Sequence, residues 1–305
     1  MTLPPDRAHV LTEQRNTRSA HLHQASIAEC IALIQDEDRS IALALDRARP
    51  ALTAFLAAVE PGFLRGGRLI YLGAGTSGRL GVLDASEAPP TFQVPPDRII
   101  GLIAGGDGAL RRSSEGKEDD PAGAVPELTA LGLRADDAVL GIAAGGSTPY
   151  VLGALRWAAA RDPRPVCGLL ACSPVEQLPQ GILPLVVATG PEVITGSTRM
   201  KAGTATKLAL NTISTTLMVR AGKVYENLMV DVRATNDKLR DRAARIVSTL
   251  TGLARAESFV ALDAAGGSAK VAVAMVRRGL EREHAERLLA AAGGRLDHVL
   301  DRVEG

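Results

Sequence analysis

The stretch Arg68–Pro90, RLIYLGAGTSGRLGVLDASEAPP, most restricts what this chain can fold into. It opens with an apolar run, Leu69–Leu72, of the kind that a buried parallel strand shows. The loop GAGTSG, residues 73–78, follows, and the apolar residues after it predict a short helix that ends before Pro89-Pro90. A strand, a glycine-rich loop and a helix start form an anion site, because the first backbone N–H groups of a helix have no partner within it.

Short apolar runs alternate with helical patterns from this stretch onward, and each run is followed within a few residues by Gly, Ser or Thr. The alternation predicts right-handed βαβ units and an α/β fold, a five-stranded parallel sheet in a three-layer sandwich. Ligands of such sheets gather at the carboxyl ends of the strands. The predicted strands are Leu69–Gly73, Ile99–Ala104, Ala138–Ala143, Val166–Ala171 and Leu185–Ala188, and the polar segments at their ends are residues 73–78, 143–149 and 189–207.

Helical patterns flank the predicted sheet on both sides. The first 20 residues are polar and are expected to be loosely held, and the apolar spacing over residues 26–59 then predicts two helices separated near residues 35–38. A long helix, Thr198–Ala221, follows the last strand, and beyond it we expect an irregular or partly helical connection and three or four short helices. The predicted domains are an N-terminal helical arm (1–60), a sheet domain (61–222) and a connection with a small C-terminal helical bundle (223–305).

Composition excludes several classes of function. The net charge of +1 and the aromatic content of 3% argue against a nucleic-acid partner, which would need a basic surface and stacking platforms. No apolar run reaches the roughly 18 residues of a membrane span, and the N-terminus has no apolar signal core. The three cysteines form no spaced cluster with the five histidines, so we expect no metal site, and Cys167 and Cys172 are predicted to be buried free thiols. A reduced, cytoplasmic protein is the expectation.

The loop GAGTSG formally matches the dinucleotide-binding pattern G-x-G-x-x-G. That pattern needs an acidic residue at the end of the second strand, about 20 residues on, to hold a ribose. Here the first acid past that strand, Asp107, comes late because Gly105-Gly106 intervenes. Gly75, Thr76 and Ser77 instead suit the several oxygens of a terminal phosphate, so a phosphate ester is favoured over a dinucleotide or a plain tight turn.

Two further polar segments are predicted to face the same ligand. AAGGSTP carries Ser147 and Thr148 at a helix start, where the alternative interpretation is a good helix cap. GSTRMKAGTATK carries Ser197, Thr198 and Lys201 at the head of the long helix, with Lys201 as the most plausible charge for an anionic sugar. The alternative for this segment is capping plus a basic surface.

Two carboxylates complete the candidate site. Glu87 precedes Pro89-Pro90, and Glu118 belongs to an acidic run just past the carboxyl end of a predicted strand. Such residues are usually solvated surface charges. Next to a sugar phosphate, two carboxylates would instead supply a general acid and a general base, provided that their surroundings separate their pKa values.

Four long motifs carry a resemblance to a known family: LGAGTSGRLGVLDASEAPPTF, the EGKED run, TGSTRMKAGTATKLALNTIST and GKVYENLMVDVRATNDKL. Together they resemble N-acetylmuramic acid 6-phosphate etherase, a family of the sugar isomerase (SIS) class of phosphosugar-binding domains, which is also similar to the glucokinase regulatory protein. The match covers most of residues 11–240, and the C-terminal 65 residues match only loosely.

The resemblance implies a cytoplasmic lyase of cell-wall amino-sugar recycling that needs no cofactor. It would split the lactyl ether of N-acetylmuramic acid 6-phosphate by elimination and hydration, giving N-acetylglucosamine 6-phosphate and D-lactate. Carried over by motif, Glu87 of DASE corresponds to the acid that protonates the departing oxygen, and Glu118 of EGKED to the base at carbon 2, although sequence leaves open which does which. The family is dimeric, so a partner chain is expected to complete the site, with residues 26–59 in the interface.

This chain departs from the family pattern in two places. Ala88 stands where a cysteine is common, and AAGGSTPY stands where the family often has AASGRTPY, so a serine and an arginine are missing. Ser147 is a candidate to compensate for them. Two rival functions remain: a non-catalytic phosphosugar sensor, which needs the loops but not both carboxylates, and an aldose–ketose isomerase, which the DASE and GSTRMKAGT motifs disfavour.

Overall fold

The computed structural model describes residues 6–232 and 236–301 and divides the chain into two compact units. The first unit, Met1–Ser86 with Pro96–Ser214, contains the sheet. The second unit, Glu87–Pro95 with Thr215–Gly305, contains the C-terminal helices. Among the described residues no helix is both long and apolar enough to cross a membrane.

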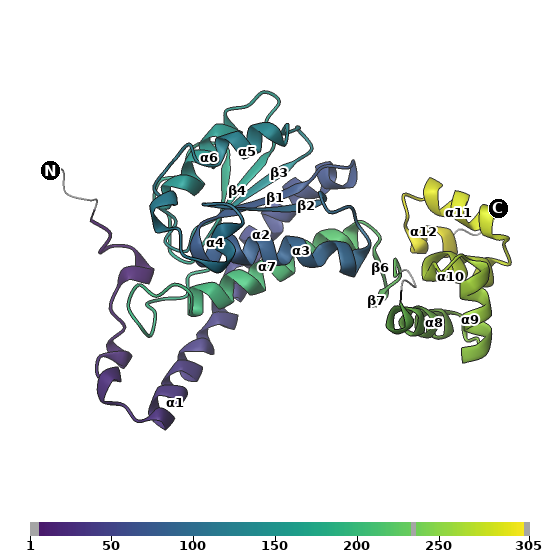
Figure 1. The fold of residues 1–305 in the computed structure, drawn as a ribbon, viewed down its shortest axis with the longest axis horizontal. Helices are drawn as coiled ribbons and strands as arrows, with labels where there is room; N and C mark the ends of the chain where they lie inside the picture. Colours follow the sequence, from purple (N-terminus) through teal and green to yellow (C-terminus); the bar gives the residue numbers. More distant parts are fainter. Residues whose placement is uncertain (1–5, 233–235, 302–305) are drawn as a thin grey trace. The chain divides into compact units, whose positions relative to one another are not determined.

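A parallel five-stranded sheet with the order β2-β1-β3-β4-β5 forms the centre of the first unit (Figure 1). Strands β1 and β3 are buried along their whole length, as expected for strands covered on both faces. The last strand begins earlier than predicted; it contains Pro184, which is tolerated because β5 lies at the sheet edge. The strands are β1 Leu69–Gly73, β2 Ile99–Ile103, β3 Ala138–Ile142, β4 Val166–Ala171 and β5 Ile182–Val186.

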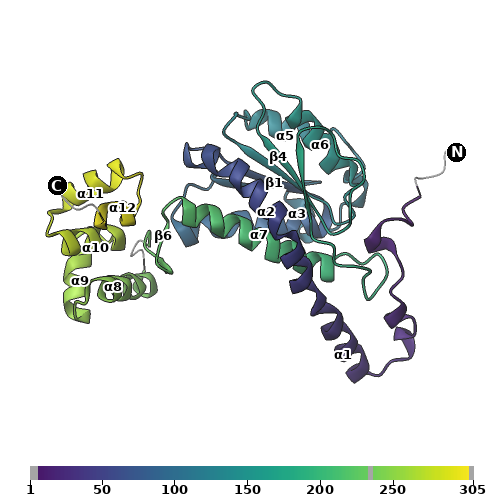
Figure 2. The same cartoon turned by 180° about the vertical axis from the view of Figure 1, so that it is seen from behind.

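Helices cover both faces of this sheet, which confirms the predicted three-layer fold class. Side chains alternate along β1: the Tyr71 hydroxyl donates to Asp84 of α3 on one face, and Leu72 packs with Val151 of α6 on the other. Figures 1 and 2 show α2, α3 and α7 on the first face and α5 and α6 on the second. The helices are α2 Ser40–Leu64, α3 Gly75–Phe92, α4 Gly108–Arg111, α5 Val125–Ala130, α6 Pro149–Ala159 and α7 Lys201–Arg220.

The prediction that the first helix after β1 ends before Pro89-Pro90 is wrong, because α3 continues to Phe92. Each proline removes one backbone donor, but its ring fixes φ near the helical value. The Gln93 N–H still donates to the Pro89 carbonyl at 2.9 Å, so helical geometry persists through the pair.

The N-terminal residues form three short 3-10 turns between Leu11 and Gln24 and then α1, Ile27–Asp38, which begins with a capping box of Ser26 and Glu29. The break before α2 falls at Arg39, next to the predicted position. Helix α2 packs on the sheet, whereas α1 extends beyond it (Figures 1 and 2).

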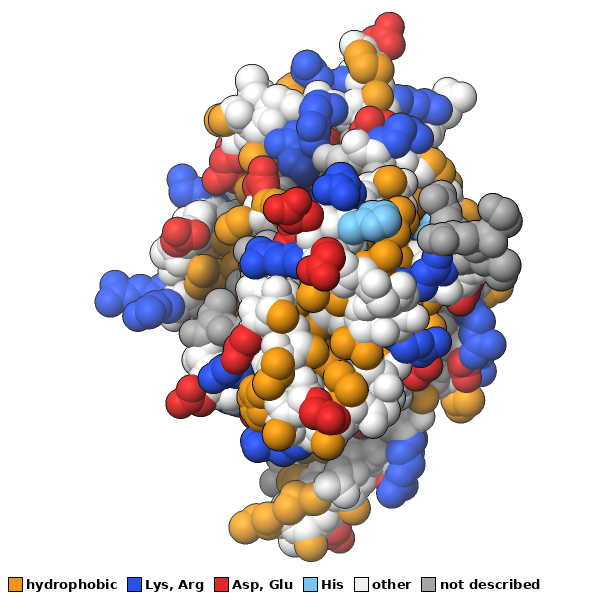
Figure 3. Space-filling model, turned by 90° about the vertical axis from the view of Figure 1, so that its right-hand side faces the viewer, with side chains coloured by type: hydrophobic (Ala, Val, Ile, Leu, Met, Phe, Trp, Pro, Cys, Tyr) orange, Lys and Arg blue, Asp and Glu red, His pale blue; other side chains and the backbone are white. Residues whose placement is uncertain are grey.

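The second unit has its own apolar core, and its described residues form five helices rather than the three or four predicted. A two-stranded hairpin, β6 Val224–Tyr225 and β7 Leu228–Met229, replaces the predicted irregular connection. On the face in Figure 3, acidic, basic and apolar side chains are interspersed. The helices are α8 Asp237–Thr251, α9 Arg255–Ala264, α10 Ala269–Arg278, α11 Arg282–Ala291 and α12 Leu296–Leu300.

The thiols of this protein are predicted to differ sharply in reactivity. Cys167 and Cys172 are buried and free, as the sequence predicted, and burial raises the pKa of each to about 12. Because the thiolate is the nucleophile, neither should react with an aromatic disulfide reagent at pH 8 in the folded protein. We expect one thiol, the half-buried Cys30, to react in the native state and all three after unfolding. Fast reaction of a second native thiol would contradict this.

Candidate active site

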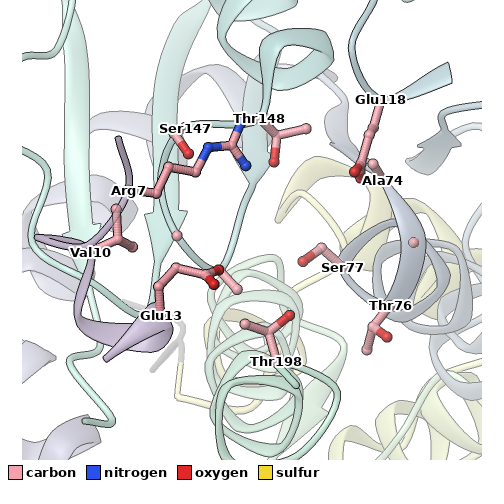
Figure 4. Close-up of a pocket in the computed structure, with 13 residues that line it drawn as sticks. Arg7, Val10, Glu13, Ala74, Thr76, Ser77, Glu118, Ser147, Thr148 and Thr198 are labelled. Carbon is pink, nitrogen blue, oxygen red and sulfur yellow. The ribbon is translucent and has the colours of Figure 1, made fainter. Parts of the chain in front are cut away.

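A pocket of about 170 Å³ opens where the first unit's loops meet at the carboxyl ends of β1 and β3 (Figure 4). Its position agrees with the rule for parallel sheets. Segments distant in sequence contribute its lining: Arg7, Val10 and Glu13; Ala74, Gly75, Thr76 and Ser77; Glu118; Ala144, Gly145, Ser147 and Thr148; and Thr198.

The loop after β1 places the start of α3 directly against the strand end. A Cβ on Gly78 would lie 2.6 Å from the Gly73 carbonyl oxygen, so the close approach requires glycine. Gly75 has a φ of +53°, a left-handed value that glycine adopts without strain. Thr76 and Ser77 therefore stand in the first turn of an 18-residue helix, where backbone N–H groups and the helix dipole favour an anion.

The loop after β3 supplies the second group of hydroxyls. Thr148 occupies the N-cap position of α6, yet its side chain makes no capping hydrogen bond. The Thr148 hydroxyl therefore does not cap α6, although a helix cap was the alternative interpretation of this segment. Ser147 and Thr148 both line the pocket, opposite Ser77 (Figure 4).

Glu118 lines the pocket beside Ala74, half-buried, as Figure 4 shows. Its main chain is held in place, because the Tyr150 N–H of α6 donates to the Glu118 carbonyl at 2.9 Å. The next two acids, Asp119 and Asp120, are exposed and absent from the lining. Among the side chains of the acidic run that the structure describes, Glu118 is thus the carboxylate that faces the cavity.

Glu87 is not among the residues that line this pocket. It lies on α3 with an exposed side chain, ten residues after Ser77. Since an α-helix rises about 1.5 Å per residue, ten residues correspond to about 15 Å along the axis. The structure therefore brings Glu118, but not Glu87, into the pocket of this chain.

The third predicted segment contributes less than expected. Thr198 lines the pocket, whereas Ser197 does not. Lys201 is also absent from the lining: its side chain is 3% exposed and its ammonium lies 2.5 Å from the Glu37 carboxylate. The start of α7 is capped by buried Glu192, which accepts the backbone N–H groups of Lys201 and Ala202 at 2.9 Å.

The Lys201–Glu37 pair is expected to contribute to stability rather than to binding. Burial raises the pKa of Glu37, but hydrogen bonding and charge from Lys201 outweigh it, so the pKa lies below its ordinary 4.5. Replacing Lys201 with Met leaves the buried Glu37 carboxylate with the partly exposed Arg18 as its ion partner. We expect the free energy of unfolding to fall by about 3 kcal/mol. The double replacement, Glu37→Met with Lys201→Met, should recover most of it.

Urea unfolding measures these differences, with Arg49→Ala, which removes an exposed ion pair, as a control expected to cost under about 1 kcal/mol. The sign of the pH dependence follows from the lowered pKa of Glu37: the stabilisation is present above pH 4.5 and is lost as the pH falls through the folded-state pKa. An equal loss for Lys201→Met and Arg49→Ala would contradict this account.

Sequence reasoning missed the pocket residues Arg7, Val10 and Glu13. The polar N-terminal segment is held against the sheet's loops, because the Leu11 N–H donates to the Ser173 hydroxyl at 3.0 Å and Thr12 is fully buried. No pattern in the segment signals this docking. Among the described residues no cluster of His, Cys, Asp or Glu suits a metal ion.

Residues 52–159 match the family model of the glucokinase regulatory protein N-terminal SIS domain. The chain is also similar to three curated proteins named N-acetylmuramic acid 6-phosphate etherase. The protein from Synechococcus sp. is 51% identical over 92% of this chain and 89% of its own length. The protein from Gloeobacter violaceus is 48% identical over 99% of this chain and 98% of its own length. The protein from Mycolicibacterium smegmatis is 47% identical over 95% of this chain and 97% of its own length.

A solved phosphoheptose isomerase from Neisseria gonorrhoeae matches with a TM-score of 0.43 at 18% identity, covering 63% of this chain and 98% of its own.

Proposed function

The chain belongs to the N-acetylmuramic acid 6-phosphate etherase family, and we propose that its pocket carries out the ether cleavage by elimination followed by hydration. The activity itself, that of a carbon–oxygen lyase in N-acetylmuramate catabolism, follows from 48% identity across 99% of the chain. The single observation that carries the mechanism is the pocket, where the Glu118 carboxylate faces hydroxyls at the starts of two helices.

We assign the phosphate of the substrate to the first turns of α3 and α6. Ser77 and Thr148 face the cavity there, and the Thr148 hydroxyl is not used as a cap. Helix N-termini favour anions, and hydroxyls donate to phosphate oxygens, so this part of the pocket has the chemistry that a phosphosugar needs. Gly75, Thr76, Ser147 and Thr198 complete its lining.

Elimination requires the open-chain aldehyde form of the sugar. The proton on carbon 2 is then acidic, because the carbanion that remains delocalises onto the carbonyl group. Glu118 removes this proton, the bond from carbon 3 to the lactyl oxygen breaks, and Glu87 protonates the departing oxygen to give lactate. Water then adds to the carbon 2–carbon 3 double bond, with its hydroxyl at carbon 3 and a proton at carbon 2.

We further propose that this chemistry takes place in a homodimer in which Glu87 of the partner subunit reaches the pocket. Two observations support it: Glu87 is absent from the pocket lining of its own chain, and its side chain is exposed. The candidate interface lies on α1 and the start of α2, where Ile27 is 82%, Ile31 51% and Leu43 59% exposed. Large apolar side chains exposed together in this way are typical of surfaces that bind another chain.

Lactate release by the purified full-length chain tests the proposed function. We expect D-lactate from N-acetylmuramic acid 6-phosphate and none from the sugar without its phosphate, because the helix starts would then have no phosphate to bind. Binding of the phosphosugar without lactate release would contradict the proposal and leave a phosphosugar sensor.

A further inference from the structure

Arg7 is the one lysine or arginine among the described residues that line the pocket. Two carboxylates, Glu13 and Glu118, line it as well, so the protein's formal charge there is negative. A sugar phosphate brings further negative charge, which two helix starts offset only in part. A positive side chain in this position therefore has an evident ligand.

The guanidinium of Arg7 extends to the loop after β3 and lies beside Ser147 and Thr148 (Figure 4). The side chain is exposed, and in the described part of the chain no carboxylate pairs with it. Glu13 lies in the same pocket without forming an ion pair with it. The five donors of this guanidinium are thus available to a ligand.

The position of Arg7 is set by contacts on either side of it. The Val10 N–H donates to the Arg7 carbonyl at 2.9 Å, and Val10 is 7% exposed. The next residue, Leu11, is bound through its N–H to the Ser173 hydroxyl. The backbone of Arg7 therefore belongs to a short turn that is fixed by the buried Val10 side chain and by the hydrogen bond of Leu11.

The loop after β3 leaves room for the N-terminal segment. A Cβ on Gly145 would lie 3.3 Å from Val10 Cγ1, so the absence of a side chain at Gly145 lets this segment approach the loop.

We propose that Arg7 binds the phosphate of the substrate together with Ser147 and Thr148. The phosphate is favoured over the lactyl carboxylate because the hydroxyls and the N-terminus of the 11-residue helix α6 converge at this end of the pocket. A guanidinium also binds phosphate oxygens in a bidentate manner. Arg7 is a binding residue that transfers no proton. This inference rests on the proposed function and extends it to the specificity of the same pocket.

Calorimetric binding of N-acetylglucosamine 6-phosphate tests the proposal, since this sugar has the phosphate but no lactyl group. Arg7→Ala is expected to raise its Kd by about 10- to 100-fold, the range for losing a hydrogen bond to a charged group. Arg7→Lys should raise the Kd less than Arg7→Ala does, because lysine keeps the positive charge although it lacks the planar guanidinium that binds two oxygens at once. Arg156→Ala, which removes an exposed arginine from α6, should leave the Kd unchanged and controls for net charge.

Kinetics with N-acetylmuramic acid 6-phosphate provide the second arm. We expect Arg7→Ala to raise KM with little change in kcat. An unchanged Kd for N-acetylglucosamine 6-phosphate with a raised KM would assign Arg7 to the lactyl carboxylate and overturn the phosphate assignment. No change in either, or a fall in kcat alone, would overturn the whole inference. Failure of the proposed function would appear separately, as wild-type protein that binds but releases no lactate.

Discussion

Replacing Glu118 with Gln is expected to abolish both lactate release and the exchange of the carbon-2 proton with solvent deuterium. The amide keeps the shape of the side chain but cannot accept the proton, and a placed general base contributes about 10²–10⁴-fold. The hydrogen bond from the Tyr150 N–H to the Glu118 carbonyl does not involve the Glu118 side chain, so the loop should keep its position in the variant. Replacing Glu87 with Gln should lower lactate release by a similar factor while leaving some exchange, because only protonation of the leaving oxygen is lost.

Proton NMR of the sugar in deuterium oxide measures the exchange, and an enzymatic assay measures the lactate. Asp119→Asn is the matched control, because Asp119 is the next acid of the same run, is exposed and does not line the pocket. It should keep wild-type activity. Equal exchange in the two glutamine variants would refute this division of labour, and exchange retained in Glu118→Gln but lost in Glu87→Gln would reverse it.

A hybrid dimer of one Glu118→Gln subunit and one Glu87→Gln subunit is expected to be active although each parent dimer is nearly inactive. If each pocket takes Glu118 from one chain and Glu87 from the other, the hybrid has one intact site and one doubly altered site. By the two-fold symmetry of such a dimer, its activity should be about half that of the wild type. Co-expression of differently tagged subunits and two affinity steps yield the hybrid.

The matched control is a hybrid of two Glu118→Gln subunits with different tags, which should remain inactive. An inactive mixed hybrid would mean that both glutamates act within one chain, and α3 would then have to be repositioned for Glu87 to meet Glu118. A monomeric wild-type protein in solution would contradict the dimer outright.

The parts of the fold that depend on local pattern were predictable from sequence. The buried strands β1 and β4 match their predicted bounds, because each is a continuous apolar run followed by a small polar residue or glycine. The start of β5 was not predictable, since Pro184 interrupts its pattern and is tolerated through the edge position. The local rule that a helix ends before proline failed for Pro89-Pro90, because each ring keeps φ near the helical value and the Gln93 N–H still donates to the Pro89 carbonyl.

Sequence indicates which residues line the pocket where the chain's own turn sets the geometry, but not where a distant partner decides. Ser77 and Thr148 follow their strands directly, so their position in the pocket was predictable. Lys201 is turned away by Glu37, 164 residues earlier in the chain, which no local pattern reveals. Arg7 lies in a polar segment whose docking depends on the surface that it meets.

The central claim, elimination through carbon 2, is tested most directly by running the wild-type reaction in deuterium oxide and recording the proton spectrum of the product. We predict one lactate for each sugar consumed and deuterium at carbon 2 of the N-acetylglucosamine 6-phosphate, because the proton lost to Glu118 is replaced from solvent. Lactate release with the original proton retained at carbon 2 would show that the ether bond breaks without removal of that proton. That result would contradict the account.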